Sequence, residues 1–216
     1  MTSSSAEPKT ATSSRPILGS LNEICIVTPH LYQTLDNLGR LGLGPFRVFD
    51  FNSETVPEQE LRGKKGSDLF TLLVAFAESP DPREPVLEII QPLTGQTSMQ
   101  DYLDAHGNHE GVQHIAFDMD NLTMDERLGL MAARGVRPVM QGVWKGSKGV
   151  TRFCFFDTVE QGMATCFETI APSEDWQEPE CRWYPSPPTI AKAVDETLPK
   201  KSVLSAYAGG LEELLQ

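Results

Sequence analysis

Basic residues are scarce in this 216-residue chain, which has 18 lysines and arginines against 30 aspartates and glutamates. The formal net charge of -12 and the pI near 4.7 argue against a nucleic-acid partner, because binding to a polyanion depends on clustered lysine and arginine. An anionic small molecule remains compatible where basic residues gather locally. The hydrophobic content of 39%, with 10 phenylalanines, suffices for one substantial domain or for two small modules that share a core.

Cysteine is also sparse, and none of the four cysteines has the CxxC spacing of a metal or redox motif. Three of them lie inside strand-like runs, which predicts buried, reduced thiols of a cytosolic protein. The four are Cys25, Cys154, Cys166 and Cys181.

Long apolar runs are missing as well, and no window approaches the length of a membrane-spanning helix, so no membrane partner is expected. The N-terminal stretch MTSSSAEPKTATSSRP lacks the apolar core of a secretory signal and contains only two basic residues. We therefore expect a disordered tail over residues 1–19 and a cytoplasmic location, with a mitochondrial transit peptide as the alternative.

Residues 20–95 are predicted to form a first module. LNEICIVT (21–28) alternates as a strand does, and a helix follows, with Thr28 as its predicted cap and Pro29 as its first residue. FRVFDF is a second strand. The polar stretch NSETVPEQELRGKKGSD is predicted to be a loop before the runs LFTLLVAFAES and VLEIIQPL. The order is strand, helix, strand, strand, strand.

The same order returns in residues 111–171, after a linker over residues 96–110. GVQHIAFDM is a strand, and Thr123 with Glu126 forms a capping box for the helix TMDERLGLMAARG, which Gly135 ends. VRPVMQGVW, GVTRFCFFD and MATCFETIA supply three further strands. This recurrence indicates a tandem βαβββ duplication with corresponding positions in the two halves.

Residues 172–216 differ in composition from both modules. SEDWQEPECRWYPSPP is rich in proline and aromatic residues without strand alternation, and VLSAYAGGLEELLQ is typical of a short terminal helix. The extension is expected either to fold back over the body or to pack on a partner subunit, in which case the protein is a homodimer.

Each half carries two polar residues within otherwise apolar strands. Glu23 and His114 each precede an isoleucine in the first strand of their halves, and Glu88 and Glu168 lie in the last strands. A carboxylate is seldom placed in mid-strand unless it is paired, coordinates a metal or lines a wet cavity. The matched positions therefore predict one shared polar site.

Strand alternation also predicts which neighbours accompany these residues. Because successive side chains of a strand point to opposite faces, Val112, His114 and Ala116 are expected on one face of their strand.

Over residues 20–171 the chain resembles the vicinal oxygen chelate superfamily, which includes glyoxalase I and methylmalonyl-CoA epimerase. The resemblance rests on LNEICIVTPHLYQTLDNLGRLGLGPF, VLEIIQPL, GVQHIAFDMDN and CFETIAP. It implies an α+β fold in which two tandem βαβββ modules form a cupped, open mixed β-sheet barrel with the helices outside. It further implies that a divalent ion is ligated by one residue from the first and last strand of each module, namely Glu23, Glu88, His114 and Glu168.

Glu23 departs from the family pattern, which usually has histidine or glutamine at this position. Three carboxylates around a divalent ion leave a net charge of about -1, which opposes stabilisation of an oxyanion. Glu23 is therefore expected either to ligate an ion such as Zn, Mg, Mn, Co or Ni, or to stay off the metal and titrate at raised pH. Without a metal, the cluster would be coupled carboxylates suited to proton transfer near neutral pH.

The chemistry that the family implies is proton removal next to a carbonyl, with a cation stabilising the enolate. The last-strand glutamate is the base in glyoxalase-like members, so Glu168 is the first candidate for a catalytic base. Glu23 on the other side of the carbon would return the proton, and such a pair inverts a stereocentre. Glu58 and Glu60 are a second candidate, because the epimerase has a catalytic glutamate before its third strand.

Three more residues are candidates for substrate binding. Cys25 and Cys166 share faces with the first-strand and last-strand glutamates, and they either line the cavity or pack in the core. Arg152 belongs to a basic group in the second module that is either solvated or grips an acidic part of the substrate.

The expected function is that of an isomerase or epimerase acting on a small carbonyl compound. A glyoxalase-type lyase is the alternative, since its ligand set differs only at Glu23. A metal-free isomerase or cyclase and a small-molecule-binding protein of secondary metabolism are further alternatives. Extradiol dioxygenases share the superfamily but need two histidines and a carboxylate on iron, and only His114 lies in a strand here.

Overall fold

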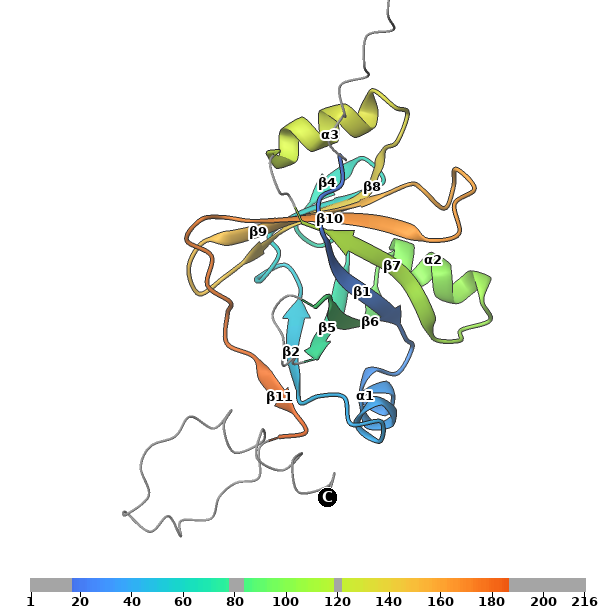
Figure 1. Ribbon diagram of the computed structural model, residues 1–216, viewed down its shortest axis with the longest axis vertical. Helices are drawn as coiled ribbons and strands as arrows, with labels where there is room; N and C mark the ends of the chain where they lie inside the picture. The colour runs from blue at the N-terminus through green and yellow to red at the C-terminus, as the bar shows by residue number, and fades with distance from the viewer. Residues whose placement is uncertain (1–16, 78–83, 119–121, 187–216) are drawn as a thin grey trace, which may run out of the picture. The chain divides into compact units, whose positions relative to one another are not determined.

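The computed structural model describes residues 17–77, 84–118 and 122–186, in which one mixed sheet of 11 strands is accompanied by three helices (Figure 1). The strands are β1 (Leu21–Val27), β2 (Phe46–Phe51), β3 (Glu58–Leu61), β4 (Lys64–Gly66), β5 (Thr71–Ala77), β6 (Val86–Thr94), β7 (Gly111–Phe117), β8 (Pro138–Lys145), β9 (Val150–Phe156), β10 (Cys166–Pro172) and β11 (Arg182–Tyr184). The helices are α1 (Leu31–Gly39), α2 (Ser98–Ala105) and α3 (Met124–Ala132). Most of the predicted N-terminal tail and the predicted terminal helix lie outside the described residues.

The sheet shows the duplication that the sequence predicts. Its central order is β2-β5-β6-β1-β7-β10-β9-β8, so each half runs from its first strand through its last strand to its middle ones. The first and last strands pair in parallel in both halves, β1 with β6 and β7 with β10, and the halves join through the antiparallel pair β1–β7. The predicted α+β fold with a curved, open mixed sheet is thereby confirmed.

The predicted polar loop after β2 contains the hairpin β3–β4, which pairs with β8 of the other module. The pattern did not reveal this hairpin because only Gln59 of β3 is fully buried. The Oε1 atom of Gln59 accepts hydrogen bonds from the backbone N–H groups of Leu69 and Phe70 at 2.7 and 3.0 Å. The hairpin thus extends the second half of the sheet with residues of the first.

The predicted linker contains helix α2, which neither the composition nor the spacing had indicated. Thr97 caps it by accepting a hydrogen bond from Gln100 N–H at 3.2 Å. Met99 and Leu103 are buried one turn apart, which fixes the helix against the sheet.

Helix starts were predicted with mixed success. The capping box of α3 is confirmed, since the Thr123 hydroxyl accepts from Glu126 N–H and the Glu126 carboxylate accepts from Thr123 N–H. The predicted start of α1 is wrong, because the helix begins at Leu31 with His30 as a cap residue that makes no side-chain capping bond. The hydroxyl of Thr28 instead accepts from His30 N–H at 3.1 Å.

Val112 does not share the face of His114, contrary to the expected alternation. The β1–β7 ladder pairs Cys25 with His114 but Ile26 with Val112, so Gln113 is the extra residue of a β-bulge. The bulge leaves Val112 55% exposed and turns Gln113 inward, where it is 3% exposed. The expected alternation of faces fails at this point because the extra residue of the bulge turns the residues before it to the opposite face.

Residues 173–184, called the strap below, fold back over the body of the chain. Trp176 packs against Trp144 with ring centroids 5.0 Å apart, and Gln177 N–H donates to the carbonyl of Lys148 at 2.9 Å. The strap ends in β11, which pairs antiparallel with β2 (Figure 1). It therefore connects β10 of the second module with β2 of the first.

The cysteines agree with the expectation from composition, since all four are free and Cys25, Cys154 and Cys166 are buried. Each of the described helices is too short or too polar to cross a bilayer.

Gly142 of β8 provides a test of the tight approach of β8 to the side chains of Phe153 and Val56. A Cβ atom there would lie 2.3 Å from Cζ of Phe153 and 2.8 Å from Cγ1 of Val56. We expect Gly142→Ala to lower the free energy of unfolding by about 1–3 kcal/mol through overpacking, as measured by urea denaturation. Gly129→Ala in α3 is the control: its Cβ would meet nothing within 4 Å, so a gain of about 0.5–1 kcal/mol is expected. Equal effects of the two changes would contradict the tight approach.

Candidate active site

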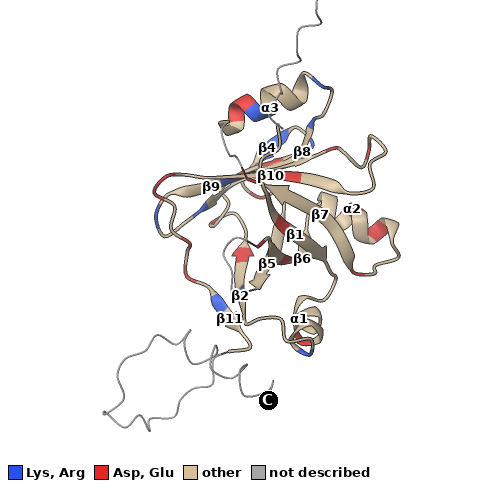
Figure 2. Cartoon of the chain, in the orientation of Figure 1, with Lys and Arg blue, Asp and Glu red and all other residues tan. Residues whose placement is uncertain are grey.

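The central strands β6, β1, β7 and β10 bring the predicted polar residues into two neighbouring rows. In one row, Cys25 lies opposite both Glu88 and His114. In the next row, Glu23 and Glu168 both lie opposite Ala116. Figure 2 shows acidic positions on β1 and β10 in the middle of the sheet.

His114 is the centre of this cluster and is 0% exposed. Its Nε2 atom lies 3.1 Å from Oε2 of Glu88 and 3.2 Å from Oε2 of Glu168. Its Nδ1 atom lies 2.6 Å from Oε1 of Gln113. Because an amide oxygen only accepts, Nδ1 carries the proton of this bond, and Nε2 is the ring atom directed at the carboxylates.

Carboxylate oxygens from three strands converge at the centre of the sheet. One oxygen each from Glu23, Glu88 and Glu168 lie within 4.8 Å of one another, and so do ligand atoms of Cys25, Glu88 and His114. Apart from the 3.2 Å contact with Nε2 of His114, the buried Oε2 atom of Glu168 has no hydrogen-bond partner among the described residues. Burying a carboxylate oxygen costs free energy unless a hydrogen-bond donor or a cation contacts it. The carboxylate oxygens and the imidazole nitrogen are ligand types that fit a divalent cation.

Burial and crowding shift the titration of the cluster. Burial raises the pKa of Glu23 well above its usual value, and the charges of Glu88 and Glu168 raise it further. Burial likewise raises the pKa of Glu168 to about 7, although the neighbouring imidazole acts in the opposite direction. Burial alone would lower the pKa of His114, but its contacts with Glu168 and Glu88 outweigh this and raise the pKa to about 9.

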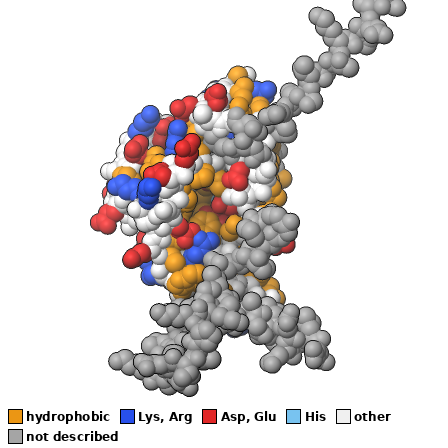
Figure 3. Space-filling view, turned by 60° about the vertical axis from the view of Figure 1, so that its left-hand side comes forward, with side chains coloured by type: hydrophobic (Ala, Val, Ile, Leu, Met, Phe, Trp, Pro, Cys, Tyr) orange, Lys and Arg blue, Asp and Glu red, His pale blue; other side chains and the backbone are white. Residues whose placement is uncertain are grey.

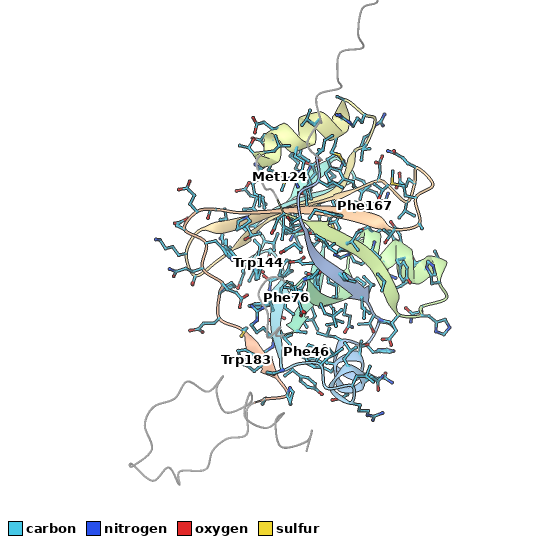
Figure 4. The ribbon with its side chains drawn as sticks, viewed as in Figure 1. Phe46, Phe76, Met124, Trp144, Phe167 and Trp183 are labelled. Atoms are coloured by element: carbon cyan, nitrogen blue, oxygen red, sulfur yellow. The ribbon has the colours of Figure 1, made fainter. Side chains whose placement is uncertain are left out.

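A cavity of about 60 Å³ adjoins the carboxylates and has an aromatic wall. Trp144 forms the middle of that wall, with its ring centroid 4.8 Å from that of Phe51 and 6.3 Å from that of Phe76 (Figure 4). The described residues around it are Glu23, Phe51, Leu72, Phe76, Glu88, Ile90, Met140, Trp144, Thr151, Phe153, Phe155, Glu168 and Ile170, with no lysine or arginine among them. The cavity therefore combines acidic groups with an apolar surface.

Arg152, predicted to bind substrate, lies on the other face of β9. Alternation along this strand directs Phe153 and Phe155 to the cavity, and Arg152 forms an ion pair with Asp125 of α3 at 2.9 Å. Glu58 and Glu60 line the same outer groove as Arg152. The second candidate base thus lies across the sheet from Glu168.

The two cysteines predicted beside the site differ in position. Cys25 stands in the row of Glu88 and His114, and burial together with the charge of Glu88 raises the pKa of its thiol well above the usual value. Cys166 lies next to a second cavity of about 260 Å³ at the side of α2, which it lines together with Tyr102 and Gln113. Burial raises the pKa of Cys166 to about 12, so both thiols are protonated.

Sequence reasoning missed Gln113 and Trp144. Gln113 orients His114 only because of the bulge, and a bulge has no signature in the alternation of this strand. The sequence predicts only that Trp144 belongs to an apolar strand. Its position in the cavity wall depends on aromatic residues of β2 and β5 that are distant in the sequence.

A paired βαβββ sheet with a buried carboxylate–imidazole cluster at its centre defines a class of proteins. The family model described as Glyoxalase/Bleomycin resistance protein/Dioxygenase superfamily matches residues 22–155, and the chain belongs to this superfamily, which is the vicinal oxygen chelate superfamily of the prediction. The match contains Glu23, Glu88 and His114 and ends before Glu168. No curated protein sequence matches the chain significantly.

Solved structures of the same fold are similar to this chain at low sequence identity. Methylmalonyl-CoA epimerase from Mycobacterium tuberculosis has 16% identity and a TM-score of 0.52, covering 75% of this chain and 93% of its own. A mutant 4-hydroxymandelate synthase from Streptomyces coelicolor has 15% identity and a TM-score of 0.50, covering 78% of this chain and 53% of its own. At such identities the likeness shows the shared fold.

The raised pKa values predict how stability depends on pH. Glu23, Glu168 and His114 all bind protons more tightly in the folded than in the unfolded chain, so without a metal the folded state loses stability as pH rises. The full contribution is present below the ordinary glutamate pKa of 4.5 and is lost as pH rises through the folded pKa values of about 7 and about 9. A divalent ion displaces these protons, so its stabilising effect should grow with pH.

The measurement is the melting temperature in chelator and in added Mn²⁺ or Zn²⁺ across this pH range. Glu168→Gln removes one titrating group and should flatten the slope seen in chelator. A melting temperature that rises with pH in the chelated wild-type protein would contradict the assignment.

Proposed function

We propose that this protein is an isomerase of the epimerase type, which transfers a proton next to the carbonyl of a small molecule. The observation that carries the proposal is the convergence of carboxylate oxygens from Glu23, Glu88 and Glu168 beside an apolar cavity. The buried imidazole of His114 contacts Glu88 and Glu168 at 3.1 and 3.2 Å. Buried carboxylates with raised pKa values are the groups that take up and return protons at neutral pH.

Glu168 is the proposed base. Its pKa of about 7 leaves a large carboxylate fraction at neutral pH while keeping that carboxylate basic enough to remove an activated proton. Burial against the sheet and the 3.2 Å contact with His114 hold it in place. Its Oε2 atom has no other hydrogen-bond partner and is therefore the atom available to a proton.

Glu23 is the proposed acid. Burial and the charges of Glu88 and Glu168 raise the pKa of this carboxyl well above the usual value, which favours its protonated form. Two carboxyl groups whose environments separate their protonation states are suited to removing and returning a proton in one reaction. Asn22 donates a hydrogen bond to Oε1 of Glu23 at 3.4 Å.

The same donor set is proposed to hold a divalent metal ion such as Zn, Mg, Mn, Co or Ni. Glu88, His114 and Glu168 would hold the ion, with Glu23 as an additional carboxylate ligand or beside the ion as the acid. When bound, such an ion polarises a carbonyl oxygen and stabilises the enolate. Gln113 keeps Nε2 of His114 directed at the ligand position through its bond to Nδ1.

The roles of the two glutamates predict different kinetic defects. With the chiral probes methylmalonyl-CoA and (R)-3-phenylbutan-2-one in deuterated solvent, we expect the wild type to invert the α-carbon of at least one probe and to incorporate deuterium. Glu168→Gln should lower both by about 10²–10⁴-fold. Glu23→Gln should retain deuterium exchange by Glu168 and lose inversion, because the removed proton is returned from the same side.

Full activity of Glu168→Gln would show that the base is assigned wrongly. Circular dichroism of each variant serves as the folding control, since glutamine is nearly isosteric with glutamate.

Elemental analysis of protein purified without chelator tests the ligand set. We expect about one divalent ion per chain, lost in the double variant His114→Ala/Glu88→Gln and retained in Arg152→Gln, which changes a charged residue on the other face of the sheet. Wild-type protein without a stoichiometric ion would contradict metal binding and leave the carboxylates to act without one.

A further inference from the structure

The charge of the cavity limits what can enter it. Three glutamates from β1, β6 and β10 adjoin it, and a divalent cation beside ionised Glu88 and Glu168 would leave no net positive charge, whether or not Glu23 is protonated. The described lining contributes no lysine or arginine. An anionic group entering such a site loses its hydration without gaining a countercharge, which is strongly unfavourable.

Arg47 of β2 carries a positive charge close to this cavity. It shares the strand face of Phe49 and Phe51, whereas the alternate residues Phe46 and Val48 pack with α1. Its guanidinium carbon lies 5.7 Å from the ring centre of Phe76, which lines the cavity. An arginine in this position would ordinarily be a candidate for binding a carboxylate of a substrate.

The strap neutralises this arginine. Glu178 of the strap forms an ion pair with Nη1 of Arg47 across 131 residues of sequence, and both side chains are partly buried, with exposures of 23% and 33%. Two residues earlier, Trp176 covers Trp144 of the cavity wall. Figure 3 shows apolar side chains within a hollow on this face and charged side chains at its rim. Glu178 thus occupies the place at Arg47 that the carboxylate of a substrate would take.

We propose that the substrate of this site is an uncharged carbonyl compound with a flat, apolar body, and that Glu178 is the residue that determines this specificity by masking Arg47. The inference rests on the proposed function for the identity of the site, and it adds the class of substrate. The apolar body lies on the wall formed by Phe51, Phe76 and Trp144, and the carbonyl points to the carboxylates. A substrate with a carboxylate attached to its carbonyl group is rejected by charge.

Phenylacetone and phenylpyruvate are a matched pair of probes for this proposal. Both have a benzyl group on a ketone, and they differ by a methyl group in one and a carboxylate in the other. Isothermal titration calorimetry on the full chain, with the metal ion that it carries after purification, should give at least tenfold tighter binding of phenylacetone. Tighter or equal binding of phenylpyruvate, or binding of neither ketone at millimolar concentration, overturns the proposal.

Glu178→Gln tests the masking itself. It removes the negative charge that the strap places on Arg47 and should increase the affinity for phenylpyruvate about tenfold while leaving that for phenylacetone unchanged. The matched control is Glu180→Gln, which removes the same charge from an exposed position of the strap and should change neither affinity. If Glu178→Gln only loosens the strap, the affinities for phenylpyruvate and phenylacetone will change together. That result, or an unchanged ratio of the two affinities, overturns the role of Glu178.

Deuterium exchange at the benzylic CH₂ of phenylacetone, followed in the same samples, separates this inference from the proposed function. Selective binding without exchange would support the substrate class and contradict the proton-transfer chemistry. Exchange of phenylacetone together with equally tight binding of phenylpyruvate would support the chemistry and contradict the role of Glu178.

Discussion

The antiparallel pairing of β1 with β7 is the contact on which both the sheet and the candidate site depend. It is the junction of the two modules, and its register sets Cys25 opposite His114 and Glu23 opposite Ala116. A slip by one residue would turn every side chain of one strand to the opposite face and would separate the imidazole from the carboxylates. The bulge at Gln113 belongs to this junction, and it both permits the register and supplies the hydrogen bond that orients the imidazole.

The β1–β7 junction brings ionisable side chains together in the interior, where burial disfavours their charged forms. Three carboxyl groups and a histidine in a pocket with little access to water weaken the fold, and the raised pKa values of Glu23 and Glu168 are the sign of that cost. The aromatic interior around Phe49, Phe51 and Trp144 offsets it by burial of apolar surface. Such an electrostatic cost is expected at a site whose groups must change protonation state. It means that the pH dependence of stability is set by the same residues that are proposed to react.

The fold and the gathering of the polar residues could be predicted because both depend on local patterns that occur twice. Glu23 corresponds to His114 and Glu88 to Glu168, and a duplicated sheet must bring corresponding positions to its pseudo-symmetric centre. Features without such a pattern were not predicted. The hairpin β3–β4 buries one side chain of β3, and α2 fixes itself with two apolar residues. The direction of Arg152 depends on which face of β9 is inside, which the run GVTRFCFFD does not determine, since phenylalanine or cysteine stands on both faces.

The interactions that bear on the substrate lie outside the duplicated pattern altogether. The family match ends at residue 155, whereas the strap begins at residue 173 and supplies Trp176, which packs on Trp144 of the cavity wall, and Glu178, which pairs with Arg47. The partners of both residues, Trp144 and Arg47, belong to different modules, so the strap acts on the two halves of the cup at once. A superfamily that shares its sheet and its ligand positions can diverge in substrate only through what surrounds them. In this chain the strap lies outside the family match, and its residue Glu178 neutralises Arg47, which stacks on Phe76 of the cavity wall. On our proposal, this ion pair determines that the site binds a neutral rather than an anionic carbonyl compound.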